Sequence, residues 1–374
     1  WQEARRHETA WQDLAHNAME SNVFLLPAFV LTAVHHGAAA QRPHFIFVWR
    51  DAVSRSSDDL LGVFVMHIPS PGAGTIARLW SSAITALGTP LMRPGEGVQT
   101  VDRLLSWLAA RFPHVHGLSL PQMALDGPVA RLFLQDARAH GRGSRVFDRR
   151  SRAIVTSELS ASDFLSSFAS SKKQKELRRQ RRRLAECGKL TYSSARTSEQ
   201  IREAMERFLL LEASGWKGDQ STALLSDVST STFARAMTRL FAQEQSCRID
   251  ALELDGVPIA MGIVLVAGDT AFYWKTAYDE RFARYSPGVL FSIEMTTRAM
   301  TQGTHALINS CAVPNHPMID HIWRERIELG DILVQMRGVS QTAFAISAST
   351  QGALRRMRAT AKSFYHALRS RGVG

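Results

Sequence analysis

The chain has 374 residues, which is enough for about two domains that each bury a core. Hydrophobic residues make up 45% of the sequence and charged residues 21%, so the composition excludes a disordered chain. The formal net charge of +11 favours an anionic partner. It does not distinguish nucleic acid, a membrane surface, and a phosphorylated cofactor or substrate.

Apolar runs and cysteines bear on the compartment. The longest apolar runs, near residues 24 and 257, each cover about half of a bilayer span and contain a proline, so we expect no transmembrane helix. The first residues, WQEARRHETAW, lack the apolar core of a signal peptide. The three cysteines, Cys187, Cys247 and Cys311, are far apart, which favours neither a disulfide framework nor a zinc site. We therefore expect a cytoplasmic protein that uses no metal.

The first half of the sequence predicts helices, then paired strands, then alternating helices and strands. Residues 9–37 predict two short helices that Ser21, Asn22 and Pro27 separate. The elements expected after them are strands at 44–52 and 60–68, a helix at 101–112, a strand at 115–123, a helix at 127–141 and a strand at 145–159.

The second half repeats this order. The elements expected are a strand at 190–195, helices at 198–215 and 229–245, strands at 248–254, 257–267 and 270–277, a helix from Ser286, a strand at 305–313, a helix at 316–327 and a strand at 331–336. Residues 257–267 are apolar or small on both alternating faces, which predicts a central strand. We therefore expect an α+β protein built from a duplicated unit.

Four regions follow from this order. We expect an N-terminal domain at 1–150, a connecting strand and basic helix at 151–189, a C-terminal domain at 190–340, and a basic helical extension at 341–374. Each domain should hold a mixed, mostly antiparallel sheet that helices flank.

The segment that connects the halves, SSKKQKELRRQRRRLAECG, carries a dense run of cations. These are Lys172, Lys173, Lys175, Arg178, Arg179, Arg181, Arg182 and Arg183. Leu177 and Leu184 could hold one edge of the helix to the body. The cations form either a solvated face or a site for an anionic partner. The run contains no aromatic residue to stack on bases, which makes nucleic acid the less favoured polymer.

The helix that is expected to begin at Ser286 has the chemistry of a phosphate site at its start. Ser286 can cap a helix, Pro287 suits its first position, and Gly288 leaves the backbone open to close approach. Free N–H groups and the positive end of the helix dipole coincide there. Arg284 adds positive charge and Tyr285 completes the segment. The first half lacks such a start, so we expect only the second half to hold a cofactor.

Several segments together resemble a known family. They are SKKQKELRRQRRRLAECGKL, FLLLEASGWKG, ALELDGVPIAMGI, AFYWKTAYDERFARYSPGVL and SCAVPNHPMIDHIW. They look like the CelD/BcsL-type acetyltransferases of the GNAT superfamily, which are associated with cellulose and other exopolysaccharide synthesis. That family is similar in turn to the Fem-type double-GNAT transferases. The resemblance implies tandem GNAT-like domains, acetyl-CoA or another acyl-CoA as co-substrate, and a saccharide or other polar acceptor.

The sequence departs from these relatives at two places. Asn309 stands where the resemblance implies an acidic residue before Ser310. The usual GNAT pyrophosphate signature is absent, and RYSPGVL takes its place. Fem-type proteins also depart there, and some use aminoacyl-tRNA as donor.

Direct acyl transfer needs a base, donors for the oxyanion, and positioning of both substrates. The candidate bases are Asp279, beside the expected cofactor loop, and His316 and His321, which can titrate near neutral pH. A capping or packing role is the alternative for both histidines. Cys311 is expected to be inert packing.

Four residues are candidates for substrate binding. Trp216 and Lys217 lie between glycines in the sequence Gly-Trp-Lys-Gly, and Glu212 lies one turn earlier. Lys275 lies on a strand with apolar neighbours, where a charge needs a carboxylate or phosphate partner. A helix stop with a packed Trp216 and a structural ion pair at Lys275 are the alternatives.

Three functions follow. The first is an acyl-CoA-dependent N- or O-acyltransferase. The second is a Fem-like transferase that takes its donor from tRNA through residues 172–183. The third is a non-catalytic binding or assembly subunit, for which Asn309 would mark lost chemistry.

Overall fold

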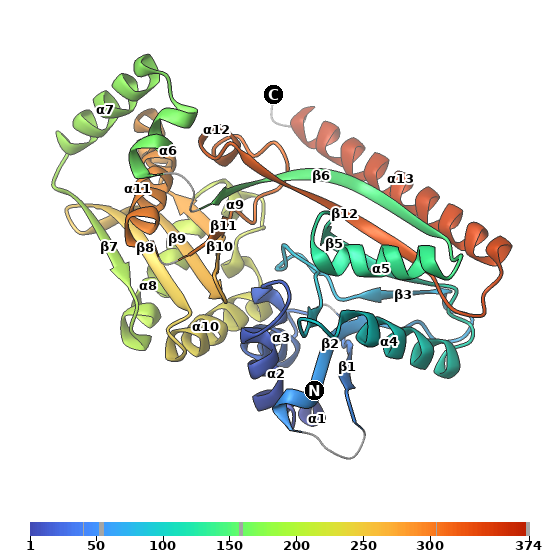
Figure 1. Ribbon diagram of the computed structural model, residues 1–374. Coiled ribbons are helices and arrows are strands. Elements are labelled where there is room, and N and C mark those ends of the chain that lie inside the picture. The colour runs from blue at the N-terminus through green and yellow to red at the C-terminus, as the bar shows by residue number, and fades with distance from the viewer. Residues whose placement is uncertain (40, 52–55, 157–159, 304, 372–374) are drawn as a thin grey trace.

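One sheet runs through both halves of the chain in the computed structural model (Figure 1), which describes residues 1–39, 41–51, 56–156, 160–303 and 305–371. The first half contains helices α1 (Gln2–Arg5), α2 (Glu8–His16), η1 (Val23–Leu25), α3 (Pro27–His35), η2 (Ser57–Asp59), α4 (Gly97–Arg111) and α5 (Pro128–Ala139). Its strands are β1 (His44–Trp49), β2 (Leu60–His67), β3 (Ile76–Leu79), β4 (Leu91–Met92), β5 (Gly117–Ala124) and β6 (Ser144–Thr156).

The connecting segment and second half follow the same plan. The helices are α6 (Ala161–Phe168), α7 (Ser171–Ala185), α8 (Ser198–Ala213), α9 (Trp216–Asp219), η3 (Leu224–Ser226), α10 (Val228–Gln243), η4 (Glu280–Tyr285), α11 (Pro287–Gln302), α12 (Ile319–Ile322) and α13 (Gln341–Arg371). The strands are β7 (Leu190–Ala195), β8 (Cys247–Leu254), β9 (Val257–Ala267), β10 (Thr270–Tyr278), β11 (Leu307–Asn309) and β12 (Glu325–Gln335).

The strands of the two halves lie on opposite sides of the sheet and meet at β12 and β6. Eleven of its twelve described strands follow the order β1-β2-β3-β5-β12-β6-β11-β10-β9-β8-β7, and the remaining strand, β4, pairs with β2. In each half a helix joins two parallel strands, since α4 lies between β3 and β5 and α11 between β10 and β11. The other strand pairs are antiparallel. The predicted α+β class with a mixed, mostly antiparallel sheet is therefore confirmed.

The last strand of each half lies beside the parallel pair of the other half. β6 pairs with β11, and β12 pairs with β5 and β6. The sequence predicts the strand at 331–336 as part of the C-terminal domain, but β12 lies between two strands of the first half. The sequence-based domain boundaries stay a prediction, and this exchange makes the sheet continuous.

The segment at 316–327 is mostly not the helix that we predicted. α12 covers four residues, and β12 already begins at Glu325. Ile319, Ile322 and Trp323 are buried at helical spacing, which explains the prediction. From Glu325 to Glu328 exposure alternates, which is the period of a strand, and the rest of β12 is buried.

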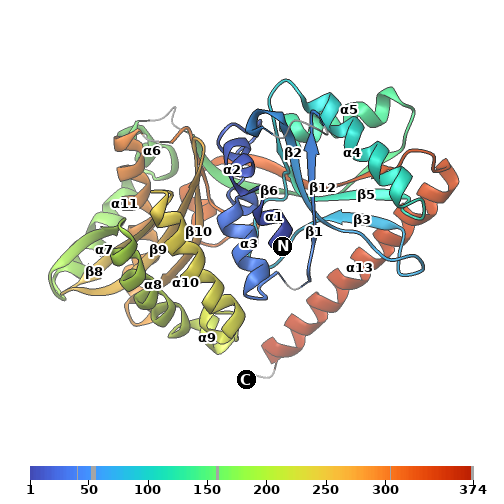
Figure 2. The same ribbon diagram turned by 90° about the horizontal axis from the view of Figure 1, so that it is seen from below.

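Aromatic side chains fill the seam between the two lobes. Figure 2 shows α2 and α3 between the sheet of the first half and α10 of the second. The rings of Phe29 and Phe233 lie 5.1 Å apart, and both pack against Trp274. The Trp274 indole donates to the carbonyl of Ile84 at 2.9 Å. This shared core holds the lobes in one arrangement.

Candidate functional site

The parallel pair β10 and β11 separates part of the way along β10. The strands pair from Thr270 to Phe272, and β10 then has a bulge between Tyr273 and Lys275. A bulge bends its strand and redirects the side chains that follow. The rest of β10 and the segment after β11 therefore form the walls of an opening.

A cavity of about 350 Å³ lies at this opening, and we call it the strand-end cavity. Its walls come from the end of β10, the segment that follows β11, and the region where α8 ends and α9 begins. The residues that line it are Leu211, Glu212, Gly215, Trp216, Lys217, Thr276, Ala277, Tyr278, Val313, His316, Pro317 and Met318. It therefore brings together four predicted site residues: Glu212, Trp216, Lys217 and His316.

A buried ion pair forms one wall of the strand-end cavity. Lys217 donates to Glu212 at 2.9 Å and to the carbonyl of Thr276 at 2.7 Å. The other carboxylate oxygen of Glu212 accepts from the amide of Leu224 at 2.8 Å. The Glu212 side chain is fully buried, so Lys217 neutralises a charge that would otherwise be costly. In this structure both residues hold the wall of the site.

The Gly-Trp-Lys-Gly segment begins a short helix. The Trp216 amide donates to Glu280 at 2.9 Å, and its side chain is 46% exposed at the rim of the cavity. A side chain at Gly218 would put a Cβ atom 1.9 Å from the carbonyl oxygen of Ala213. Gly218 is therefore needed for this close approach, whereas the exposed indole of Trp216 is free to contact a ligand.

Lys275 faces a different side of the sheet from Tyr273, contrary to our expectation. Because of the bulge, the two residues pair with the adjacent residues Val264 and Ile263 of β9, which point into different cores. Burial lowers the pKa of Lys275, and the Glu212 carboxylate partly opposes this effect. No ion pair of Lys275 with the described residues is recorded, and the proposed contact with a carboxylate or phosphate stays a prediction.

His316 lines the cavity with a defined hydrogen-bond pattern. Its Nδ1 atom accepts from the amides of Met318 and Ile319, both at 3.3 Å, which places the proton of the neutral ring on Nε2. Burial lowers the pKa of His316, the Asp320 carboxylate opposes this, and Lys217 adds to the lowering. The ring is therefore better suited to donate a hydrogen bond from Nε2 than to accept a proton.

The structure separates the other two candidate bases from His316. His321 is exposed on α12 and does not line the cavity. The Asp279 carboxylate accepts from the backbone amide and the guanidinium of Arg281. These bonds hold the pKa of Asp279 below its ordinary value, which makes it a weak base.

The start of α11 packs against two of the residues that line the strand-end cavity. Ser286 has a left-handed conformation, with φ of 53°, and its side chain makes no capping hydrogen bond, so the predicted capping bond is wrong although the position is right. Pro287 is the first helical residue. A Cβ atom on Gly288 would lie 2.9 Å from the Met318 sulfur and 3.2 Å from the Tyr278 ring, and both of these residues line the cavity.

The first amides of α11 lie at a buried helix start, where Pro287 and Gly288 are both buried. No acceptor among the described residues is recorded for the amides of Gly288 and Val289. The Arg284 guanidinium lies 4.7 Å from the centre of the Tyr285 ring, and the Tyr285 hydroxyl lies 3.4 Å from the Cys187 sulfur. Arg284 is exposed beside the helix start, where its charge favours an anion.

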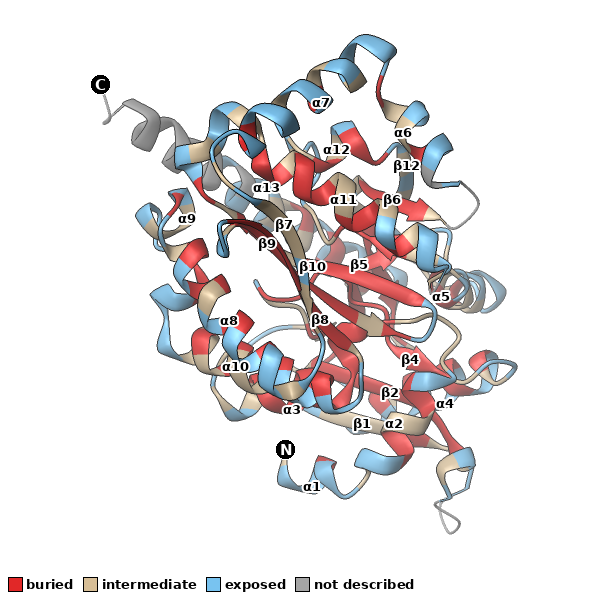
Figure 3. Ribbon diagram, turned by 90° about the vertical axis from the view of Figure 1, so that its left-hand side faces the viewer, coloured by how far each residue is buried: buried red, intermediate tan, exposed pale blue. Residues whose placement is uncertain are grey.

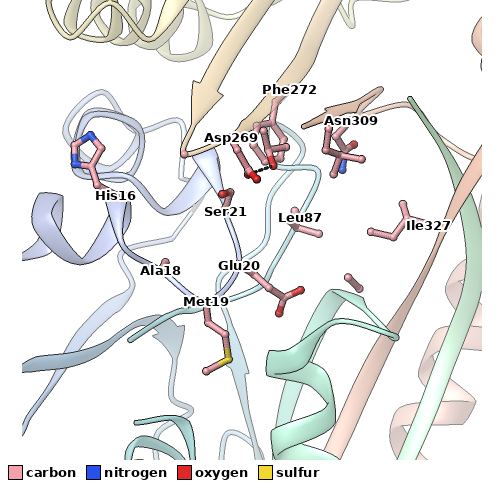
Figure 4. Close-up of a pocket in the computed structure, with 14 residues that line it drawn as sticks. His16, Ala18, Met19, Glu20, Ser21, Leu87, Asp269, Phe272, Asn309 and Ile327 are labelled. Carbon is pink, nitrogen blue, oxygen red and sulfur yellow. Dashed lines mark hydrogen bonds between the residues drawn. The ribbon is translucent and has the colours of Figure 1, made fainter. Parts of the chain in front are cut away.

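A larger cavity of about 550 Å³ lies between the lobes, and we call it the inter-lobe cavity (Figure 4). It is lined by Glu20, Ser21 and Leu87 from the first half and by residues such as Asp269, Phe272 and Asn309 from the second. Since Thr270 and Phe272 border this cavity and Thr276 to Tyr278 border the strand-end cavity, β10 contributes to the walls of both.

Asn309 points an unsatisfied donor at the inter-lobe cavity. The residue is 1% exposed, and its Oδ1 atom accepts from the amide of Cys311 at 3.0 Å. No partner among the described residues is recorded for its Nδ2 group. Glu20 accepts from the amide of Val129 at 2.9 Å, and burial raises the pKa of Glu20. Sequence reasoning singled out Asn309 but missed Glu20, which becomes part of a site only when the lobes meet.

Within the described ranges, no group of three or more His, Cys, Asp or Glu side chains is arranged to hold a metal ion. Burial raises the pKa of Cys311 to about 12, so its thiol stays protonated at neutral pH.

None of the helices that the structure describes is long and apolar enough to cross a membrane.

Comparison with known proteins finds a similarity in the second half of the chain. Residues 171–309 match the Acetyltransf_6 family model, which is described as an acetyltransferase (GNAT) domain. A search of curated proteins finds no match.

Solved structures support the fold over most of the chain. FemX has 10% sequence identity and a TM-score of 0.59, with 87% of this chain and 95% of FemX covered. The C-terminal domain of a putative lysylphosphatidylglycerol synthetase from Agrobacterium fabrum has 14% identity and a TM-score of 0.54, with 92% and 96% covered. A conserved protein of unknown function from Bacteroides thetaiotaomicron has 12% identity and a TM-score of 0.56, with 89% and 97% covered. The chain therefore shares the fold of these structures over most of its length, and residues 171–309 are similar to a GNAT acetyltransferase domain.

Proposed function

We propose that the protein transfers an acyl group, with acetyl as the first candidate, directly from acyl-CoA to an amine or hydroxyl of a polar acceptor. The observation that carries this proposal is the strand-end cavity beside the first turn of α11. The unbonded amides of Gly288 and Val289 would hold the CoA diphosphate, because a helix start favours phosphate. The thioester would then lie in the opening between β10 and the segment after β11.

The proposed reaction needs no covalent enzyme intermediate. The acceptor nitrogen or oxygen attacks the thioester carbon, the new bond forms as the carbon–sulfur bond breaks, and the acceptor proton ends on the CoA thiolate. The Nε2–H group of His316 donates to the oxygen that becomes negative in the transition state. Asp279 is the weaker of our base candidates because its carboxylate is bonded to Arg281.

The inter-lobe cavity is the proposed entrance for the acceptor. It lies on the same strand as the donor site and offers the free Nδ2 donor of Asn309 together with the carboxylates of Glu20 and Asp269. Amino and hydroxyl groups complement these side chains, which suits a sugar or a precursor of an exopolysaccharide or the cell envelope. The resemblance to CelD/BcsL-type proteins motivates that choice of acceptor. The names of the similar structures reported above mention no such acceptor.

Donor binding provides the test. We expect acetyl-CoA to bind in calorimetry and Ser286→Glu to weaken it by more than about tenfold, because like charges would meet at the diphosphate. Ser286→Gly is the matched control, since glycine tolerates the left-handed conformation at this position. S-acetylpantetheine, which lacks the diphosphate, should bind both variants equally. No binding of acetyl-CoA or longer acyl-CoAs to the parent protein would reject the proposal.

A Fem-like transfer from aminoacyl-tRNA is the second candidate, and the exposed cations of α7 favour it. It predicts tRNA binding whose affinity falls steeply with salt, with a slope set by several neutralised phosphates. A non-catalytic role in polysaccharide assembly is the third candidate, and Asn309 favours that one. It predicts full cellular function after His316 is replaced.

A further inference from the structure

Helix α7 is a basic helix at the edge of the molecule. Figure 1 shows it on the outside of the second lobe, and Figure 3 shows most of its surface exposed. Leu177 and Leu184 are its buried residues, and all eight lysines and arginines from Lys172 to Arg183 are exposed. The helix therefore adds little to the core and presents its charge to the solvent.

Most of this charge is not neutralised within the protein. Arg179 pairs with Glu176, Arg181 with Glu294, and Arg182 with Glu186. For the other five cations no ion pair with a described residue is recorded, and these are Lys172, Lys173, Lys175, Arg178 and Arg183. A cluster of unpaired cations attracts anionic surfaces, and each cation near such a surface adds to the attraction.

An apolar groove of about 330 Å³ lies beside these cations, between α6, α7 and α11. Leu165, Leu177, Leu290 and Ile293 supply its apolar lining, and Arg178 and Arg181 lie at its edge. An unpaired Arg178 beside an apolar groove complements a molecule that joins a phosphate to a hydrocarbon chain. RNA offers the phosphate but no chain, and no aromatic side chain lines the groove to stack on a base.

We propose that α7 and this groove form a peripheral docking surface for an anionic phospholipid bilayer. The free cations of α7 contact lipid phosphates, and the groove takes up part of an acyl chain. A polybasic segment combined with a small apolar insertion gives reversible binding without a membrane-spanning helix. This surface is separate from both cavities, so the inference does not depend on the proposed transferase activity.

Vesicle binding tests this inference. The full chain is sedimented with phosphatidylcholine vesicles and with vesicles that also contain phosphatidylglycerol, over a series of salt concentrations. We expect binding to the anionic vesicles only. The triple variant K172Q/K175Q/R178Q should bind them on the order of 100-fold more weakly, from roughly fivefold for each lost cation.

Matched variants separate this surface from a general charge effect. R111Q/R138Q/R239Q removes the same number of exposed cations from α4, α5 and α10, and it should retain binding. Ile293→Ser should reduce the binding that persists at high salt, whereas Val98→Ser, at an exposed apolar residue of α4, should not. The inference is overturned if both triple variants lose binding equally, if phosphatidylcholine binds as well, or if tRNA binds and vesicles do not.

Discussion

The ammonium of Lys217 lies 2.9 Å from the carboxylate of Glu212, whose side chain has no exposed surface. Removal of one partner from a buried pair leaves an uncompensated charge. We expect Lys217→Met to lower the free energy of unfolding by roughly 3 kcal/mol or more. Chemical denaturation of the purified variant measures this loss.

The double variant Glu212→Gln/Lys217→Met is the control for that loss. Glutamine removes the buried charge and keeps an oxygen for the amide of Leu224, so much of the lost stability should return. A double variant less stable than Lys217→Met alone would show that the pair does not act as we describe.

The ring of His316 should make stability depend on pH. Because burial lowers its folded-state pKa, the unfolded chain binds more protons over that range. The stabilising contribution is complete above the ordinary value of 6.5 and is lost as pH falls from there toward the folded-state pKa. Unfolding measured between neutral and mildly acidic pH should show this loss.

His316→Asn isolates the ring of His316 from the other histidines. Asparagine can keep an acceptor for the amides of Met318 and Ile319 but does not titrate, so the variant should lose less stability on acidification than the parent. It also removes the Nε2–H donor, and we expect kcat to fall about 100-fold with little change in donor KM. Parallel pH curves would contradict the lowered pKa of His316 in the folded protein.

The sequence predicts individual elements better than their partners. The run at 257–267 is apolar on both faces, and β9 is indeed a buried strand between β10 and β8. The exchange of β6 and β12 was not predicted, because a strand pattern fixes which faces are buried and not which strand lies alongside. At 316–327 the local pattern was misleading, since Ile319, Ile322 and Trp323 are also spaced as on a helix.

The candidate site was predictable where local chemistry is unusual. The sequence alone identifies Trp216, between glycines, and His316 as candidate site residues, and the fold brings both to one cavity. The orientation of Lys275 depends on a β-bulge that the sequence pattern does not predict. Glu20 was missed because its role depends on a cavity that forms where the two lobes meet.

Asp279→Asn should distinguish a structural carboxylate from a base. Arg281 lowers the pKa of Asp279, so the carboxylate binds protons weakly at neutral pH. We expect transferase activity to fall by less than the roughly 100-fold that the loss of a general base brings. Steady-state kinetics against donor and acceptor measure this, and a larger drop with unchanged KM would restore Asp279 as the base.

Substitutions of Asn309 can distinguish two roles for this position, which are binding of the acceptor and replacement of a catalytic carboxylate. Asn309→Asp keeps an acceptor for the Cys311 amide but removes the Nδ2 donor, whereas Asn309→Ala removes both. If Nδ2 binds the acceptor, both variants should raise acceptor KM by up to about tenfold, the scale of one hydrogen bond, with donor KM unchanged. Asn309→Ala should also lower the melting temperature, because the Cys311 amide loses its acceptor. Faster transfer by Asn309→Asp would instead mean that this position takes a catalytic carboxylate and that the present chain works without it. Because the residue is 1% exposed, the new carboxylate would have a raised pKa, and the gain in rate would appear as pH rises.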